Sequence, residues 1–119
     1  MSDVGRVTTT NHGGAQLTVD RGEHELRVTL VGEVDLANAR DVLQTVLATE
    51  PTAFEHVLVD VSEVTYLDSA GISLLVDLAR RLRTARSRFE VRAPVGTSAR
   101  RIIALTGLEE TLDVLAEDQ

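Results

Sequence analysis

Apolar and polar residues alternate twice near the start of the chain, which predicts two neighbouring β-strands. The alternation covers residues 16–20 and again residues 26–30, and the polar residues between them suit a turn. We therefore expect a β-hairpin that ends at Gly32. Residues 1–14 are rich in Thr, Gly and Asn and offer little to bury, so they are expected to form a disordered tail, with one domain over residues 15–119.

From Leu36 onward the apolar residues recur at helical spacing, until Pro51 ends the pattern, which predicts a first helix. A second helix is predicted over residues 69–84 by an apolar stripe of Ile72, Leu75, Val76, Ala79 and Leu82. Ser98 can cap a third helix that ends at Gly107.

Short apolar runs between these helices predict further strands at residues 57–61 and 89–93, and residues 111–115 predict a short last one. Strands that alternate with helices after a hairpin imply right-handed βαβ crossovers. The predicted fold class is therefore α/β, a small and mostly parallel mixed sheet with an antiparallel edge hairpin, flanked by helices. Function in such sheets lies where strand ends meet helix starts.

The composition excludes several classes of protein. With 119 residues, 43% hydrophobic and 26% charged, the chain has the composition of an ordinary globular domain. Its formal charge of -7 disfavours binding to nucleic acid or to anionic membrane surfaces. There is no Cys, which removes thiol nucleophiles and disulfides, and no Lys, which removes phosphate-loop NTPases. No apolar segment has the length of a leader or a membrane span, so we expect a cytoplasmic protein.

Three acidic segments follow predicted strands, at residues 32–35, 60–63 and 68–71, and the last is the most informative. Ser69 stands at the predicted start of the second helix, and the small residues Ala70 and Gly71 leave its hydroxyl unshielded. The simpler interpretation is that Asp68 or Ser69 caps the helix, which stabilises it by about 1 kcal/mol. Capping alone does not require small residues at both following positions.

Catalytic and metal-site interpretations of these residues are weaker. A nucleophilic serine needs a neighbouring base, and neither His12, His24 nor His56 is predicted to lie near Ser69. The carboxylates could hold Mg²⁺, but the chain lacks the parts that position a phosphoryl group. We therefore expect no catalysis, no cofactor and no metal, and interpret the acidic rim as a docking face for a protein.

Several segments match a known family in their order along the chain. They are Gly-Glu-Val-Asp at residues 32–35, the helix that follows, the strand at residues 57–61, Tyr-Leu-Asp-Ser-Ala-Gly-Ile at residues 66–72 and Thr-Gly-Leu at residues 106–108. In this arrangement the chain resembles the STAS domain of bacterial anti-sigma factor antagonists over about residues 15–116. The most specific element is Asp68, Ser69 and Gly71 after a hydrophobic strand.

The resemblance implies a binding protein of transcription regulation that is switched by phosphorylation. In such families the serine corresponding to Ser69 is phosphorylated by the anti-sigma factor, an ATP-dependent kinase, and a PP2C-type phosphatase removes the phosphate. The unphosphorylated antagonist captures the anti-sigma factor and frees a sigma factor. On this basis the residues expected at the partner are Glu33, Asp35, Asp60, Asp68 and Gly71.

The second predicted helix adds two candidate partner contacts. Ser73 and Asp77 share a flank with Ser69, whereas Leu74 and Leu78 lie on the other flank and either widen the core stripe or face a partner. Six arginines between residues 80 and 92 suit a solvated helix end, with a docking site for an acidic partner as the alternative.

A second function remains open at this stage. A STAS module can also act as an adaptor in a transporter or a signalling complex without phosphorylation. Direct nucleotide binding is the least favoured alternative, because no phosphate cradle is legible in the sequence.

Overall fold

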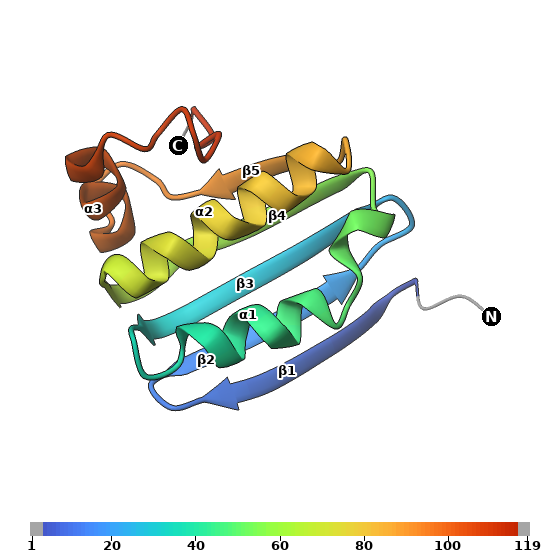
Figure 1. The fold of residues 1–119 in the computed structure, drawn as a ribbon. Coiled ribbons are helices and arrows are strands. Elements are labelled where there is room, and N and C mark those ends of the chain that lie inside the picture. Colours follow the sequence, from blue (N-terminus) through green and yellow to red (C-terminus); the bar gives the residue numbers. More distant parts are fainter. Residues whose placement is uncertain (1–3, 117–119) are drawn as a thin grey trace.

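Five strands form one mixed sheet in which they lie in the same order as along the chain (Figure 1). The computed structural model describes residues 4–116. β1 to β3 are antiparallel, and β3 to β5 are parallel. The strands are β1 (Arg6–His12), β2 (Ala15–Arg21), β3 (Glu25–Val34), β4 (His56–Leu67) and β5 (Arg88–Arg92).

Helices α1 (Ala39–Leu47) and α2 (Ser69–Thr84) lie side by side across one face of the sheet, while α3 (Ser98–Thr106) packs against β4 (Figure 1). A short 3-10 helix, η1 (Pro51–Ala53), follows α1. Among the described residues, no helix combines the length and the apolar character that crossing a bilayer requires. The predicted α/β class with an antiparallel edge is confirmed, and β1 lies outside the predicted hairpin as the edge strand.

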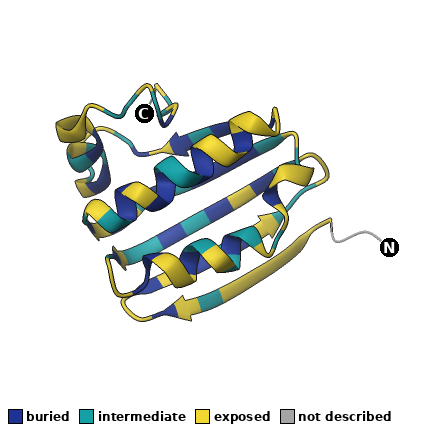
Figure 2. Ribbon diagram, viewed as in Figure 1, coloured by how far each residue is buried: buried dark blue, intermediate teal, exposed yellow. Residues whose placement is uncertain are grey.

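The core lies between the sheet and its two covering helices. Buried and exposed residues alternate along β2 and β3, and buried positions lie along the sheet beneath the helices (Figure 2). Leu17 of β2 pairs with Leu30 of β3 in this core. The helix stripe predicted for residues 69–84 is buried for Ile72, Leu75, Ala79 and Leu82 and partly buried for Val76. Burial of such side chains stabilises the fold by about 1.5–3 kcal/mol each.

The expected tail is wrong for residues 6–12, which form strand β1. This strand pairs with β2 along its whole length, from Arg6 opposite Arg21 to His12 opposite Ala15. Its residues show no apolar alternation because the side chains that face the helices are Arg6, Thr8, Thr10 and His12. Backbone pairing holds the strand in place, and residues 1–3 of the expected tail, like residues 117–119 of the expected domain, lie outside the described residues.

Two of the predicted strands are longer than their apolar runs. β3 does not end at Gly32 but continues to Val34 through an irregularity in its register with β4. Gly32 has a φ of +100°, and a Cβ atom there would overlap the carbonyl oxygen of Gly14, so only glycine fits this position. β4 is also longer than its apolar run. It begins one residue before the expected start at Val57 and ends at Leu67, six residues after the expected end at Val61.

The helix and strand near the C-terminus also differ from the prediction. Thr97, and not Ser98, caps α3, since its hydroxyl accepts a hydrogen bond from the Arg100 N–H at 3.2 Å. Gly107 ends the helix as expected, with a φ of +72°. Residues 111–115 form turns instead of a strand, apart from one bridge between Val91 and Val114.

Candidate functional site

Asp68 joins the start of α2 to the loop after β3. Its Oδ1 accepts hydrogen bonds from the N–H groups of Ala70 at 2.9 Å and Gly71 at 3.1 Å, so Asp68 is the N-cap of the helix. Its Oδ2 accepts a third bond from the Leu36 N–H at 3.2 Å. The capping interpretation is therefore correct for Asp68, and the same carboxylate holds two loops together.

Ser69 is the first residue of α2 and is exposed. Within residues 4–116 its hydroxyl makes no hydrogen bond, because Asp68 already accepts from the free amides of the first turn. A helix start carries a partial positive charge, so an anion at this position is electrostatically favoured. Ser69 thus presents an unused hydroxyl to solvent at a point where added negative charge is tolerated.

Gly71 has an internal role, which corrects the expectation that it contacts a partner. It is buried, and a Cβ atom there would overlap Leu67 Cδ1 and lie 3.0 Å from the carbonyl oxygen of Val34. The missing side chain lets α2 approach the ends of β3 and β4. The small residue at this position serves packing and does not provide room beside Ser69.

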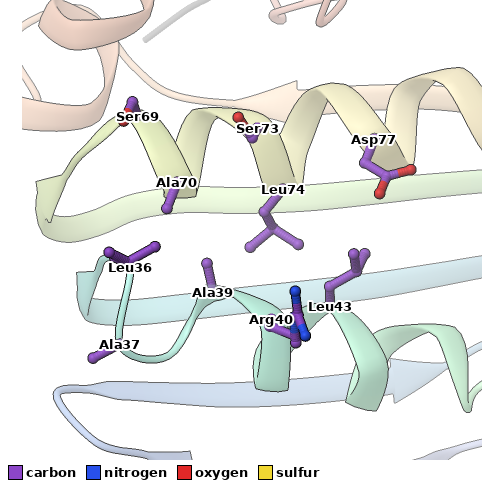
Figure 3. A pocket seen from close by; sticks show the side chains of 10 residues that line it. All are labelled: Leu36, Ala37, Ala39, Arg40, Leu43, Ser69, Ala70, Ser73, Leu74 and Asp77. Atoms are coloured by element: carbon purple, nitrogen blue, oxygen red, sulfur yellow. The ribbon is translucent and has the colours of Figure 1, made fainter.

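A groove lies beside Ser69 between the first halves of α1 and α2, and we call it the α1–α2 groove. Its volume is about 670 Å³, within the range of about 300–1,000 Å³ that is usual for binding pockets. Figure 3 shows Leu43 on α1 and Leu74 on α2 pointing into the space between the two helices. The residues that line the groove are Leu36, Ala37, Ala39, Arg40, Leu43, Ser69, Ala70, Ser73, Leu74 and Asp77.

The structure brings Ser73 and Asp77 together with Ser69 on this groove. Ser73 is exposed, and the Asp77 carboxylate accepts a hydrogen bond from Arg81 Nε at 2.7 Å. Leu74 and Leu78 are both buried, so the interpretation that they widen the core stripe is correct. Leu74 belongs to the core and also forms part of the groove floor.

Glu33 and Asp35 lie near the groove but do not line it. Asp35 is half-buried, and its Oδ1 accepts a hydrogen bond from the Ala37 N–H at 3.0 Å, which shapes the loop before α1. Glu33 is exposed at the end of β3, in register with Tyr66 of β4. Of these two carboxylates, Asp35 is the one whose loop Asp68 contacts directly.

Asp60 does not belong to this rim, which corrects the prediction. It lies in the middle of β4, opposite Thr29 and Arg92, on the face of the sheet without helices. Seven residues of strand, or roughly 20 Å, separate it from the end of β4. Its carboxylate accepts bonds from the Ser62 N–H at 2.9 Å and hydroxyl at 2.5 Å and lies 3.7 Å from Arg92 Nε.

The groove residues contributed by α1 and the loop before it were not predicted from the sequence, and of these Leu36 and Arg40 are both exposed to a partner. Leu36 was assigned to the buried stripe of the first helix, but it precedes α1 and is 83% exposed at the groove. Its place directly after Asp35, in a segment that begins with acidic residues, is the signal that could have marked it as a loop residue. Arg40 lies on the exposed side of α1 and gives the groove a cation.

Four of the six arginines between residues 80 and 92 contact groups inside the domain. Two of these four, Arg88 and Arg92, lie in β5 and not at the end of α2. The contacts are Arg81 with Asp77, Arg83 with the carbonyl oxygen of Thr111, Arg88 with Glu90 and Arg92 with Asp60. In residues 4–116, no cluster of three or more His, Asp or Glu side chains could hold a metal ion.

The family of this chain follows from a match over most of its length. Residues 17–116 match the family model described as Mlab, STAS domain. The chain belongs to the STAS domain family. The predicted resemblance is therefore confirmed, and the match includes the helix start at Ser69 and both helices of the groove.

Solved structures of anti-sigma factor antagonists share this fold. An anti-sigma factor antagonist from Mycobacterium paratuberculosis is 26% identical, with a TM-score of 0.73 over 98% of this chain and 91% of the other. The anti-sigma factor antagonist SpoIIAA in its unphosphorylated form is 16% identical, with a TM-score of 0.69 over 87% and 88% of the two chains. The phosphorylated form of the Bacillus cell fate determinant SpoIIAA is 15% identical, with a TM-score of 0.62 over 87% and 91%.

Proposed function

We propose that this STAS domain is an anti-sigma factor antagonist, which captures an anti-sigma factor while Ser69 is unmodified and so releases a sigma factor. The observation that carries the proposal is the exposed and unbonded Ser69 hydroxyl at the edge of the α1–α2 groove. The similarity to the mycobacterial antagonist over nearly the whole of both chains supports it. The protein acts by binding and catalyses no reaction.

The α1–α2 groove suits a protein partner. Its floor is apolar, and its rim carries the polar side chains of Arg40, Ser73 and Asp77. An apolar centre within a polar rim is the usual arrangement of a protein interface. A partner seated here would cover Ser69 and contact Leu36, with Asp35 and Glu33 beside the contact area.

Phosphorylation of Ser69 weakens the binding of the partner to the same surface. A phosphate adds about -1.5 to -2 charges at neutral pH. In the free domain the group stays in solvent at the start of α2, where the helix dipole favours it. In a complex it would be desolvated next to Asp68, and an unpaired buried charge costs about 2–5 kcal/mol. This corresponds to a loss of affinity of about thirty-fold to several-thousand-fold.

The partners implied are an anti-sigma factor that phosphorylates Ser69 with ATP and a PP2C-type phosphatase that reverses the reaction. A switch of this kind acts on transcription, so the cytoplasm is the proposed location. Neither nucleic acid nor a membrane is proposed as a direct partner.

The phosphoacceptor is tested by incubating the protein with its cognate anti-sigma factor and labelled ATP. We expect one phosphate per chain, no label on a Ser69→Ala variant, and full label on the matched control Ser98→Ala, which removes an exposed hydroxyl from the first position of another helix, α3. Full labelling of the Ser69→Ala variant would remove the proposed role of Ser69. If the unmodified domain instead co-purifies with transporter subunits and is never labelled, the adaptor function is favoured.

A further inference from the structure

The two outer edges of the sheet differ in the part of the chain that the structure describes. At the β5 edge, the Val91 N–H donates to the carbonyl oxygen of Asp113 at 3.3 Å, and the Val91 carbonyl oxygen accepts from the Leu115 N–H at 2.9 Å. The segment after α3 therefore covers that edge. At the other edge, β1 pairs with β2, and residues 7–11 make no backbone hydrogen bond to any other described segment (Figure 1).

The open side of β1 suits pairing with a further strand. An edge strand presents a row of N–H and C=O groups, and Pro, Lys, bulges or a very short strand commonly prevent a second chain from pairing with them. β1 is seven residues long, contains neither Pro nor Lys, and pairs with β2 without a shift in register. Residues 7–10 are a valine and three threonines, β-branched residues that favour strands.

The charge of this edge favours a second copy of the chain as the neighbour. Two chains that each carry a formal charge of -7 repel one another over most of their surfaces. Residues 4–19, which include all of β1, contain no Asp or Glu. Asp41 contacts β1 at its last residue, where its Oδ2 lies 2.5 Å from His12 Nδ1. Contact along residues 7–11 therefore joins two strands that carry no carboxylate of their own.

The sequence of β1 also matches itself when two copies run antiparallel about Thr9. In this register Thr9 lies opposite Thr9 of the second copy, Thr8 lies opposite Thr10, and the five central pairs contain no charged residue. Threonine pairs on neighbouring strands are stabilising, and the chain already contains one, because the hydroxyl oxygens of Thr9 and Thr18 lie 3.0 Å apart. All seven residues pair in this register.

We propose that this protein forms a two-fold symmetric dimer through β1, with Thr9 on the symmetry axis. Directly opposed residues point to the same face of a sheet, so the helices of both copies cover one face of a continuous sheet with five strands from each copy. The contact is one strand wide, so we expect a dimer that dissociates on dilution. The α1–α2 groove lies between the helices and not at this edge, so the dimer does not depend on the proposed function.

Sedimentation velocity from low micromolar to millimolar protein tests the dimer. The unmodified protein should change from monomer to dimer over this range. Thr9→Glu places two carboxylates directly opposite each other on the axis, so it should weaken the dimer at least about tenfold. The matched control Asn11→Glu adds the same charge at an exposed position on the same face of β1. Its two carboxylates would lie about 14 Å apart, beyond the screening length of about 8 Å at physiological salt, so dimerisation should change by less than about twofold.

A single introduced thiol tests the register, because the chain contains no Cys. In the proposed dimer the two Cα atoms at position 9 lie about 4.5–5.5 Å apart, within the range that a disulfide bridges, whereas those at position 11 lie about 14 Å apart. Under oxidised glutathione, Thr9→Cys should form a covalent dimer and Asn11→Cys should remain largely monomeric. This pair also decides the question if Thr9→Glu does not fold.

Three results would overturn the proposal. They are an unmodified protein that stays monomeric at millimolar concentration, a dimer whose dissociation constant a folded Thr9→Glu variant leaves unchanged, and equal cross-linking at positions 9 and 11.

Discussion

The start of α1 borders an apolar groove, and its end borders a polar cavity. Near its start, the α1–α2 groove has an apolar floor with Leu36 exposed at its edge. Near its end, a cavity of about 220 Å³ between α1 and β1 is lined mainly by arginines and threonines. The helix that separates them is nine residues long, or about 13 Å. One helix thus borders an apolar groove at its start and a polar cavity at its end.

The difference comes from what α1 packs against at each end. Its start meets α2, whose facing residues are small or apolar, so the groove exposes apolar surface that a partner can bury. Its end meets β1, whose inward side chains are polar, so the cavity between them is lined by polar and charged side chains. A substitution at one end of α1 can therefore leave the lining at the other end unchanged.

The largest effect is expected from Asn38→Ala, which removes the side chain that ties β1 and β3 to the loop before α1. Asn38 is 5% exposed, and its Nδ2 donates to the carbonyl oxygens of His12 in β1 at 2.9 Å and Glu33 in β3 at 2.8 Å. Its Oδ1 accepts from the Asp35 N–H at 3.0 Å. Loss of these bonds leaves buried backbone groups unpaired, so urea unfolding should show a stability lower by about 2–4 kcal/mol.

Asn11→Ala is the matched control, because Asn11 is exposed on β1 next to His12. A surface change of this kind should alter the free energy of unfolding by less than about 0.5 kcal/mol. Equal stabilities of the two variants would mean that Asn38 does not connect β1 to the loop before α1.

A smaller effect, confined to one end of α1, is expected from Leu36→Asp. Leu36 is exposed, so the free energy of unfolding should change by less than about 0.5 kcal/mol. Affinity for the anti-sigma factor, measured by calorimetry, should fall at least about tenfold, because an apolar contact becomes a buried charge. An unchanged affinity for the anti-sigma factor would remove Leu36 from the proposed interface.

The parts of the fold that follow apolar periodicity could be predicted from the sequence. The β2–β3 hairpin and α2 contain regular patterns of buried residues. The bounds of α2, including its start at Ser69, follow from its pattern. β1 could not be found in this way, because its inward residues are polar and its place depends on backbone pairing with β2. Apolar periodicity reveals elements that bury one face, and it does not reveal a strand that is held mainly by backbone hydrogen bonds.

The errors at the candidate site have tertiary causes. Asp60 was placed on the rim because the apolar run ends beside it, but β4 continues to Leu67. Leu36 fits a helical stripe by spacing, yet Asp68 holds it in a loop through a bond across thirty-two positions of sequence. Gly71 was assigned to the surface, although the atoms that exclude a side chain there belong to β3 and β4. Local sequence does not contain these contacts.

The affinity of the cognate anti-sigma factor for this protein, compared with and without a phosphate on Ser69, tests the central claim most directly. Calorimetric titration of the two forms should give dissociation constants that differ by at least about thirty-fold, with tighter binding by the unmodified form. Dissociation constants that agree within about twofold, in a phosphorylated protein that is still folded, would contradict the proposal that Ser69 controls access to the α1–α2 groove.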